Sequence, residues 1–309
     1  MTEVNLGAAY SAIISPEDYN RLMSKEHLYI NQSDIFITEK IREFAGKGFK
    51  NVVELGCGPG KLLKRVIQVP GIDLSGIDLD QVFIEYAKEW LKDYNNLKII
   101  NQSVFDISFE HKVDIFYSGG FHHHIAPGND RHKYLSHVHS LLRDDGYYIV
   151  GDEYIPDYKN NLERELLLVI WYCHIIAHAI KHEHLYLAQE EAKTLLDDLQ
   201  EGRTEENIKT MSQINLVLDF APKIDELARA SNFQEAREKA NLFLSDLVAM
   251  NNVIHSNDVS IDATRGDYKI CDSVFIKEIE NAGFKVVEKA AYGPIETIGA
   301  LVVYVLQKS

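Results

Sequence analysis

Short apolar runs alternate with amphipathic stretches over most of residues 51–150 and again near the end of the chain. Apolar runs predict strands, and apolar positions spaced three or four residues apart predict helices. We predict strands at residues 51–55, 71–77, 97–101, 113–117, 147–150, 284–290 and 298–306, and helices at 61–69, 81–94, 131–142 and 273–281. Strands that alternate with helices indicate an α/β fold, with a mostly parallel sheet covered by helices on both faces.

Two stretches lack strand signals. Residues 1–50 show helical patterning from Asp18 to Phe44, and residues 157–258 contain only helix-length segments, among them 162–188, 190–199, 205–220, 223–230 and 233–253. The predicted organisation is therefore an N-terminal helical cover at 1–50, an α/β domain built from 51–156 and 259–309, and a helical insertion at 157–258 before the last two strands.

The net charge of the chain limits the classes of binding partner that we expect. The 309 residues include 32 Lys and Arg against 47 Asp and Glu, a formal net charge of −15. An acidic protein repels phosphate groups, so we expect neither nucleic acid nor a membrane as a partner. The longest uncharged apolar run, 166–180, is too short to span a bilayer. Three distant cysteines form no disulfide framework. We expect a cytoplasmic protein that binds a small molecule.

The strongest local signal is a glycine-rich loop between the first predicted strand and helix. It reads Glu54-Leu55-Gly56-Cys57-Gly58-Pro59-Gly60. Gly56, Gly58 and Gly60 allow a tight turn and a close approach of a ligand to the backbone, and the amides at the start of a helix attract anionic groups. The spacing differs from the dinucleotide pattern G-x-G-x-x-G and from the Walker loop.

An acid ends the second predicted strand. Asp78 lies 18 residues beyond Gly60, where a carboxylate can accept hydrogen bonds from ribose hydroxyls. Taken alone, Asp78 is also consistent with a helix N-cap at the junction of strand and helix. Together, the loop and the acid indicate adenosine binding.

The segments V-V-E-L-G-C-G-P-G and G-I-D-L-D resemble the class I S-adenosylmethionine-dependent methyltransferase family. The resemblance implies a Rossmann-like, seven-stranded sheet and S-adenosylmethionine as cofactor. It places Glu54 and the glycine loop against the methionine part, Asp78 at the ribose and Leu79 at the adenine. After the third strand the family has an acid that meets the adenine amine. This chain has Ser103 there, with Asp106 as the alternative.

The loop after the fourth predicted strand reads Ser118-Gly119-Gly120-Phe121-His122-His123-His124. In the family this loop faces the methyl group, so Ser118 is a candidate cofactor contact. His122 and His123 are candidate general bases for a hydroxyl or thiol, because histidine titrates near neutral pH. The alternative is that these histidines have no catalytic role. The Asn/Asp-Pro-Pro-aromatic motif of many amine methyltransferases is absent.

A second group of histidines lies in the predicted insertion. His174, His178 and His182 recur every fourth residue and share one side of a helix. Three interpretations stay open: a metal site, a substrate pocket and a structural stripe. We predict no metal, and Trp171, His174 and His178 are the candidate pocket residues.

The predicted function is methylation of a small molecule by in-line transfer, with oxygen or carbon favoured as acceptor and nitrogen not excluded. Residues 157–258 are expected to act either as a substrate lid or as an interface, through which a homodimer could form. The alternative is a catalytically silent protein of the same fold that binds S-adenosylmethionine as a sensor or partner subunit. An NAD-dependent oxidoreductase is disfavoured by the glycine spacing.

Overall fold

The computed structural model describes residues 10–12, 14–198, 211–230, 232, 234–242, 268–295 and 299–309. The chain divides into two compact units. The first contains Met1–Tyr154, Gly266–Tyr292 and Leu301–Ser309, and the second contains Ile155–Arg265 and Gly293–Ala300.

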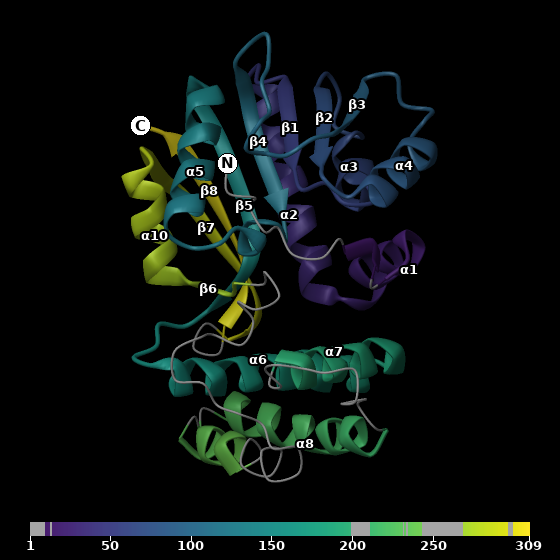
Figure 1. The fold of residues 1–309 in the computed structure, drawn as a ribbon, viewed down its shortest axis with the longest axis vertical. Helices are drawn as coiled ribbons and strands as arrows, with labels where there is room; N and C mark the ends of the chain where they lie inside the picture. Colours follow the sequence, from purple (N-terminus) through teal and green to yellow (C-terminus); the bar gives the residue numbers. More distant parts are fainter. Residues whose placement is uncertain are drawn as a thin grey trace. The chain divides into compact units, whose positions relative to one another are not determined.

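Seven strands form one sheet in the order β3-β2-β1-β4-β5-β8-β7 (Figure 1). They are β1 (Asn51–Leu55), β2 (Asp73–Asp78), β3 (Leu97–Asn101), β4 (Val113–Gly119), β5 (Leu142–Ile155), β7 (Phe284–Ile295) and β8 (Gly299–Lys308). The strands β1 to β5 pair in parallel. The predicted seven-stranded Rossmann-like sheet is confirmed, and a two-residue strand, β6 (Ile270–Cys271), adds to β5 without having been predicted.

The direction of the last strand, β8, follows from contacts at its end. Near the end of β8, the Lys308 ammonium group donates to the Leu142 carbonyl at the start of β5. The amide of Ser309 donates to the carbonyl of Gly283, just before β7 begins. Both contacts join the end of β8 to the start of a neighbour, so β8 is antiparallel to β5 and to β7.

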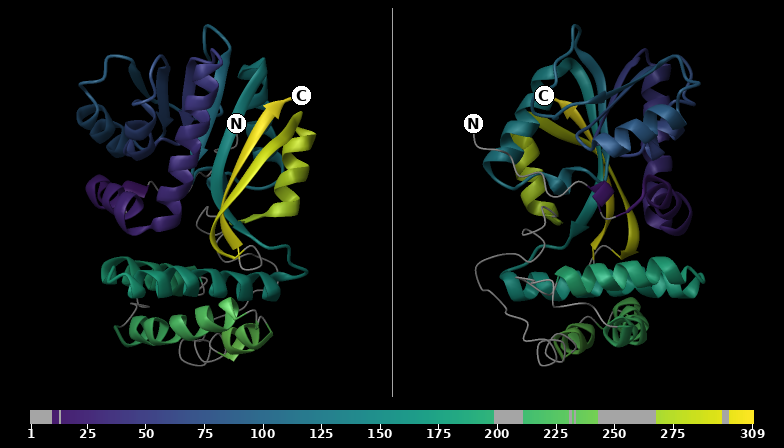
Figure 2. Two further views of the ribbon diagram at one scale, coloured as in Figure 1. Left: turned by 180° about the vertical axis from the view of Figure 1, so that it is seen from behind. Right: turned by 45° about the vertical axis from the view of Figure 1, so that its right-hand side comes forward.

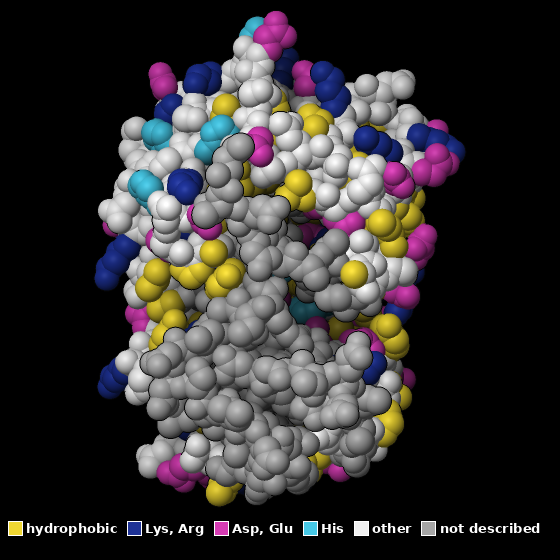
Figure 3. Space-filling model, viewed as in Figure 1, with side chains coloured by type: hydrophobic (Ala, Val, Ile, Leu, Met, Phe, Trp, Pro, Cys, Tyr) yellow, Lys and Arg dark blue, Asp and Glu magenta, His cyan; other side chains and the backbone are white. Residues whose placement is uncertain are grey.

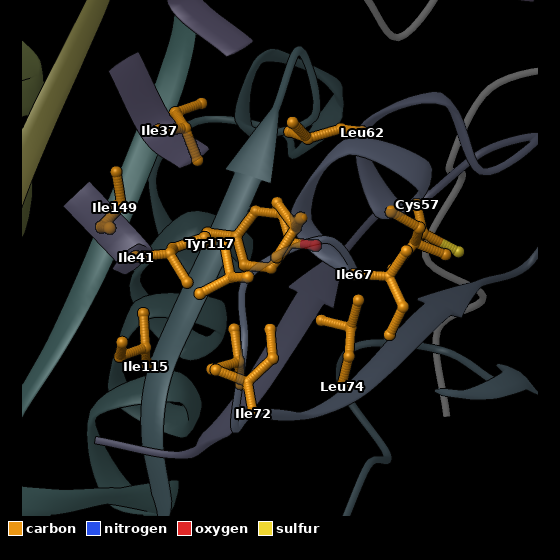
Figure 4. Close-up of a cluster of buried hydrophobic side chains, with 14 of the residues drawn as sticks. Ile37, Ile41, Cys57, Leu62, Ile67, Ile72, Leu74, Ile115, Tyr117 and Ile149 are labelled. Atoms are coloured by element: carbon orange, nitrogen blue, oxygen red, sulfur yellow. The ribbon is translucent and has the colours of Figure 1, made fainter. Parts of the chain in front are cut away.

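Helices cover both faces of this sheet (Figure 2). One face packs against α2 (Leu28–Gly46), α3 (Lys61–Val66) and α4 (Gln81–Trp90), and the other against α5 (Asn129–Leu141) and α10 (Asp272–Asn281). On the first face, Ile37, Ile41 and Leu62 surround Ile115 and Tyr117 of β4 (Figure 4). Alternate residues of β4 point to opposite faces, because the side-chain period of a strand is two.

Sequence order reverses between β1 and β4, which are neighbours in the sheet. In sheets of this kind, ligands bind at the carboxyl ends of the strands beside such a reversal. The loops after β1, β2 and β4 are therefore the part of the fold to search for a site.

One strand limit is corrected. The fifth strand, predicted at 147–150, begins already at Leu142 and ends at Ile155. The pairing of β4 with β5 changes register between Val113 and Ile115, so the strand passes through an irregularity near its start. The helical patterning over Asp18–Phe44 corresponds to several segments. Here α1 (Pro16–Arg21) leads into a short π-helical segment, Leu22–Glu26, and His27 then has extended backbone before α2.

The second unit is helical in its described part. Its elements are α6 (Asn161–Lys181), α7 (Leu185–Asp198), α8 (Met211–Arg229) and a helical stretch at 234–242, and α6 packs against both α7 and α8. The single helix predicted over 162–188 is split, because Glu183 has a left-handed φ of 61°. The two helices predicted at 205–220 and 223–230 are one helix with Pro222 inside it. Residues 205–210 and 243–253 lie outside the described part.

No helix in the described part of the chain is long and apolar enough to cross a membrane. Basic and acidic side chains are intermingled over the region of α3 and α4 in the face shown by Figure 3.

Candidate active site

The glycine loop joins the end of β1 to the start of α3. Gly56, Gly58 and Gly60 have φ values of 70°, 51° and 86°, in the left-handed region that favours glycine. The amides of Gly56 and Cys57 both donate to the Ile77 carbonyl, over 2.9 and 3.0 Å. The loop is thereby held against the last residues of β2, as the prediction of a tight ligand-binding turn requires.

Asp78 closes the loop from the side of β2. Its carboxylate accepts hydrogen bonds from the amides of Gly58 and Asp80, each 2.8 Å long. Burial raises the pKa of Asp78, and the two amide hydrogen bonds offset part of this increase. Asp78 therefore lies at the end of β2 where the ribose was predicted to bind, and it also holds the loop in shape. Leu79, predicted to contact the adenine, leaves 47% of its surface exposed.

Glu54 is buried at the end of β1 and accepts a hydrogen bond of 2.8 Å from the Tyr117 hydroxyl. Burial raises its pKa well above the ordinary value, and the charges of Asp34 and Asp78 raise it further. Asp34 of α2 is also buried and forms an ion pair of 2.6 Å with Lys61, the first residue of α3. Three carboxyl groups and one ammonium group thus gather beside the loop, an arrangement that favours a cationic ligand group.

Asp34 was not predicted as part of this site. A carboxylate within a predicted helix carries no sign of its tertiary partner. The placement of Asp34 near Gly119, 3.6 Å from a Cβ built there, depends on the packing of α2 against β4.

The two predicted serine contacts have partners within the fold. Ser103 Oγ accepts a hydrogen bond from the Phe105 amide in the turn after β3, and Asp106, the alternative, is exposed. Ser118 points to the opposite face of the sheet from Tyr117, and its Oγ lies 3.0 Å from the Tyr148 hydroxyl. A role in cofactor binding stays a prediction for both Ser103 and Ser118.

The histidine loop lies beside the glycine loop. A Cβ placed on Gly56 would lie 2.1 Å from the ring of Phe121, so the residue before the histidines touches the start of the glycine loop. The structure therefore brings the predicted catalytic histidines and the predicted cofactor loop to the same edge of the sheet.

His123 is paired with Asp152, a buried residue of β5. The His123 Nδ1 atom lies 2.5 Å from Asp152 Oδ1, and the His123 amide donates to Oδ2 over 3.1 Å. Burial acts to raise the pKa of Asp152, but the charge and hydrogen bond of His123 outweigh it and hold this pKa below its ordinary value. When Asp152 accepts a proton-bearing Nδ1, Nε2 is the basic nitrogen of the ring.

Sequence reasoning missed Asp152, which lies 29 residues from His123. One feature of the sequence could have pointed to Asp152 as a site residue. It follows the predicted fifth strand, which lies in the sheet beside the strand that carries the histidine loop. Asp152 is followed by Glu153, whose side chain is paired with Lys269. The amide of Tyr268 donates to the His123 carbonyl over 2.7 Å, so the residues before β6 also lie against the pair.

His122 has different surroundings. It is fully buried against the rings of Tyr134 and Phe275, and neither ring nitrogen has a hydrogen-bond partner among the described residues. Burial and the charge of Arg131 lower its pKa well below the ordinary value. Of the two predicted catalytic histidines, only His123 is paired with a carboxylate here.

In the second unit, the predicted pocket residues lie on α6. His174 is buried and forms a hydrogen bond with Asp225 of α8, and Arg229 donates to the same carboxylate over 2.8 Å. Trp171 is buried edge-on against Tyr172. His178 is partly buried, and burial, followed by the charges of His182 and His174, lowers its pKa to about 4. The contacts of His174 join α6 to α8; a substrate role for Trp171, His174 and His178 stays a prediction.

Within the residues that the structure describes, no group of three or more histidine, cysteine, aspartate or glutamate side chains is placed to hold a metal ion. The rings of His178 and His182 lie 4.4 Å apart.

Comparison with known proteins agrees with this geometry. Residues 52–146 match a family model described as a methyltransferase domain. Over 140 residues the chain is 30% identical to malonyl-[acyl-carrier protein] O-methyltransferase 1 of Ilyobacter polytropus, a match covering 42% of this chain. It covers 50% of that relative, so the chain spans about half the length of the relative it matches.

Two solved structures share the fold. An S-adenosylmethionine-dependent methyltransferase from Clostridium acetobutylicum superposes with a TM-score of 0.52 at 11% identity, covering 95% of this chain and 97% of that one. The CurJ carbon methyltransferase gives a TM-score of 0.52 at 12% identity, covering 98% of this chain and 61% of that one. At such identities the likeness concerns the fold alone.

Proposed function

We propose that this chain, which matches a methyltransferase-domain model over residues 52–146, is a class I S-adenosylmethionine-dependent methyltransferase that methylates an oxygen or carbon atom of a small-molecule acceptor. S-Adenosylmethionine is the cofactor of this family. The acceptor, the acceptor atom and the residues that act on them belong to the proposal.

The residues at the carboxyl ends of β1 and β2 fit the cofactor. It carries a sulfonium and an ammonium group, and buried carboxyl groups favour cations. Glu54 would face the methionine part, and Asp78 would accept hydrogen bonds from the ribose hydroxyls. The left-handed glycines let the backbone approach without side-chain obstruction. Leu79 would offer its exposed surface to the adenine.

The bound cofactor supplies a methyl group already activated by positive sulfur. The protein then has to orient the acceptor, exclude water and hold the acceptor's proton. His123 would take this proton on Nε2, because its Nδ1 atom is paired with Asp152. The Asp152 carboxylate would fix the orientation of the imidazole and stabilise its protonated form. In this proposal Asp152 is a positioning residue and His123 the catalytic base.

One observation carries the proposal: Phe121 lies against Gly56, and His123, two residues further on, is paired with Asp152. A basic side chain held by a buried carboxylate thus lies two residues after the residue that touches the cofactor loop. The name of the Ilyobacter relative specifies a carrier-bound malonyl group, and a malonyl thioester is for that reason one acceptor to assay.

Calorimetric titration tests the cofactor part. We expect S-adenosylmethionine to bind and NAD not to bind. The Asp78→Ala variant removes hydrogen bonds to a charged group, which contribute about 1.5–3 kcal/mol, so the Kd is expected to rise roughly 10- to 100-fold. Asp73→Ala, at the exposed start of the same strand, is the matched control and should leave the Kd unchanged.

Absence of S-adenosylmethionine binding, or equal Kd values for the two variants, would refute the assignment of the cofactor site. Binding without methyl transfer to any acceptor would instead favour the silent sensor or partner subunit.

A further inference from the structure

We propose that the ion pair of Asp34 and Lys61 binds the amino-acid end of S-adenosylmethionine, so that the protein selects ligands with both an ammonium and a carboxylate group there. This inference rests on the proposed function and adds two specificity-determining residues to it. Both residues lie outside the segments 52–60 and 76–80 that resemble the family. Their role is therefore inferred from contacts in the structure.

The pair is buried beside the glycine loop. The Lys61 ammonium group lies 2.6 Å from Asp34 Oδ2, and the side chains of Lys61 and Asp34 are 13% and 4% exposed. Lys61 is the first residue of α3 and follows directly on Gly60, the last glycine of the loop. Buried charges are costly unless they are paired. The pair thus holds two opposite charges in place beside the proposed cofactor site.

Both partners can make a second bond without breaking the first. Among the described residues, the carboxylate of Asp34 is paired with Lys61 through Oδ2. The other oxygen, Oδ1, lies 3.6 Å from a Cβ built on Gly119, at the end of β4. A carboxylate has about four acceptor positions, and an ammonium group has three donors. Asp34 can therefore accept a hydrogen bond from a ligand while Lys61 donates one.

The two charges of the pair match those of the amino-acid end of the cofactor. Burial raises the pKa of Asp34, and the positive charges of Lys61 and Arg65 offset part of this increase. A further cation beside this carboxylate is for the same reason stabilised. The ammonium group of the cofactor would meet Asp34, and its carboxylate would meet Lys61. Both cofactor groups are attached to one carbon atom, so they suit two protein charges that lie side by side.

Four ligands separate the groups that the pair is proposed to recognise. S-Adenosylmethionine has both groups of the amino-acid end and a positive sulfur, and S-adenosylhomocysteine has both groups but a neutral sulfur. Decarboxylated S-adenosylmethionine lacks only the carboxylate, and methylthioadenosine lacks the ammonium group, the carboxylate and the positive sulfur. Calorimetric titration of the purified protein and its variants gives the Kd of each ligand.

Each variant has its own expected pattern. Asp34→Asn should raise the Kd of the three ligands that carry the ammonium group about 10- to 100-fold, because a charge-assisted hydrogen bond is lost. It should leave the Kd of methylthioadenosine unchanged. Lys61→Met should raise the Kd of S-adenosylmethionine and S-adenosylhomocysteine by a similar factor, but not that of the decarboxylated compound. Lys61→Arg keeps the positive charge and should recover most of the affinity.

The matched controls are Glu39→Gln on α2 and Lys64→Met on α3. They remove the same charges from exposed positions of the same two helices. We expect them to leave the Kd of all four ligands unchanged.

Three results would overturn the inference. Equal Kd changes for all four ligands, or unchanged Kd values with a lowered Tm, would show that the pair only joins α2 to α3. An effect of Asp34→Asn on S-adenosylmethionine that is absent with S-adenosylhomocysteine would show that Asp34 faces the positive sulfur instead. If wild type binds none of the ligands, the proposed function itself fails.

The comparison does not depend on one variant. If Asp34→Asn does not fold, Lys61→Met and Lys61→Arg are compared with the same ligands. If no variant of the pair folds, the wild-type protein is compared alone. It should bind S-adenosylmethionine at least about 10-fold more tightly than the decarboxylated compound, and equal Kd values for these two ligands would overturn the inference.

Discussion

Single residues at the candidate site depend on partners that lie far away in the sequence. Glu54 accepts a hydrogen bond from Tyr117, 63 residues later, and His123 reaches Asp152, 29 residues later. The sequence shows the types of these residues, but the charge states of Glu54 and Asp152 depend on their burial and on the residues that bond to them. The pKa of Glu54 is raised well above its ordinary value, and the pKa of Asp152 is lowered.

The raised pKa of Glu54 predicts how stability changes with pH. A carboxyl group whose pKa is higher in the folded than in the unfolded state binds its proton more tightly when folded, so stability is lost as the pH rises from 4.5, the ordinary value, towards the raised value. Glu54→Gln cannot ionise and should escape this loss. Without cofactor, its Tm should therefore exceed that of wild type by a margin that grows with pH over this window.

The same variant should bind S-adenosylmethionine more weakly, because the carboxylate that faces the cofactor's positive groups is gone. Thermal unfolding at a series of pH values, with calorimetric titration at neutral pH, measures both effects. A Tm difference that stays constant over the whole pH range would contradict the assigned charge state of Glu54.

At the scale of elements, the glycine loop contacts two neighbouring parts of the fold, β2 and the loop after β4. Its amides reach back to β2 through Ile77 and Asp78, and its first glycine touches Phe121 of the loop after β4. The conformation of the loop therefore links the proposed cofactor site to the proposed base.

Substitution of Gly56 tests this link. Gly56→Ala places a methyl group 2.1 Å from the Phe121 ring at a φ of 70°, so it adds a steric clash to backbone strain. Gly71→Ala is the matched control, because its φ is 77° and nothing lies within 4 Å of the added Cβ. The strain alone costs about 1–2 kcal/mol, and we expect Gly56→Ala to lose clearly more free energy of unfolding than Gly71→Ala.

Urea unfolding gives the two free energies, and calorimetry gives the two Kd values for S-adenosylmethionine. Only Gly56→Ala should also weaken cofactor binding. Equal stability losses in the two variants would show that Phe121 does not press on the loop.

At the scale of the whole molecule, the chain combines an α/β unit with a helical unit inserted before its last strands. The proposed cofactor and base residues all belong to the first unit, and the His174–Asp225–Arg229 network belongs to the second. The predicted lid function and homodimer interface of the helical insertion stay predictions; sedimentation velocity would check the latter.

The His174–Asp225–Arg229 network predicts how the stability of the helical unit changes with pH. Burial acts to raise the pKa of Asp225, but its hydrogen bonds with His174 and Arg229 outweigh this and lower it. Asp225 therefore stabilises the fold above its ordinary pKa of 3.8, and this contribution is lost as the pH falls. Asp225→Asn should reduce the free energy of unfolding by about 1–3 kcal/mol near neutral pH.

The difference between Asp225→Asn and wild type should diminish in acid, and the Kd for S-adenosylmethionine should stay unchanged. Asp219→Asn on the same helix serves as the control. Denaturant unfolding at pH 7 and at pH values below 3.8, with calorimetry, tests this. A raised Kd for Asp225→Asn would show that the network acts on the cofactor site.

The sequence by itself determined the fold class and the glycine loop, and its resemblance to a known family predicted the cofactor. Strand and helix periods, left-handed glycines and an acid at a strand end are local properties, because they depend on side chains a few positions apart. The limits of β1 and β3 were predicted to the residue for this reason. The start of β5 at Leu142 was not, because it depends on the pairing of Leu142 with Val113 of β4, which no local pattern around Leu142 records.

Only the tertiary structure decided which acidic residues accompany the loop and the histidines. Asp34 meets Lys61 through the packing of α2 on α3, and Asp152 meets His123 because β5 lies beside β4. It likewise decided that His174 bonds to Asp225. Contacts between residues dozens of positions apart depend on how elements pack, and no local pattern along the chain records that packing.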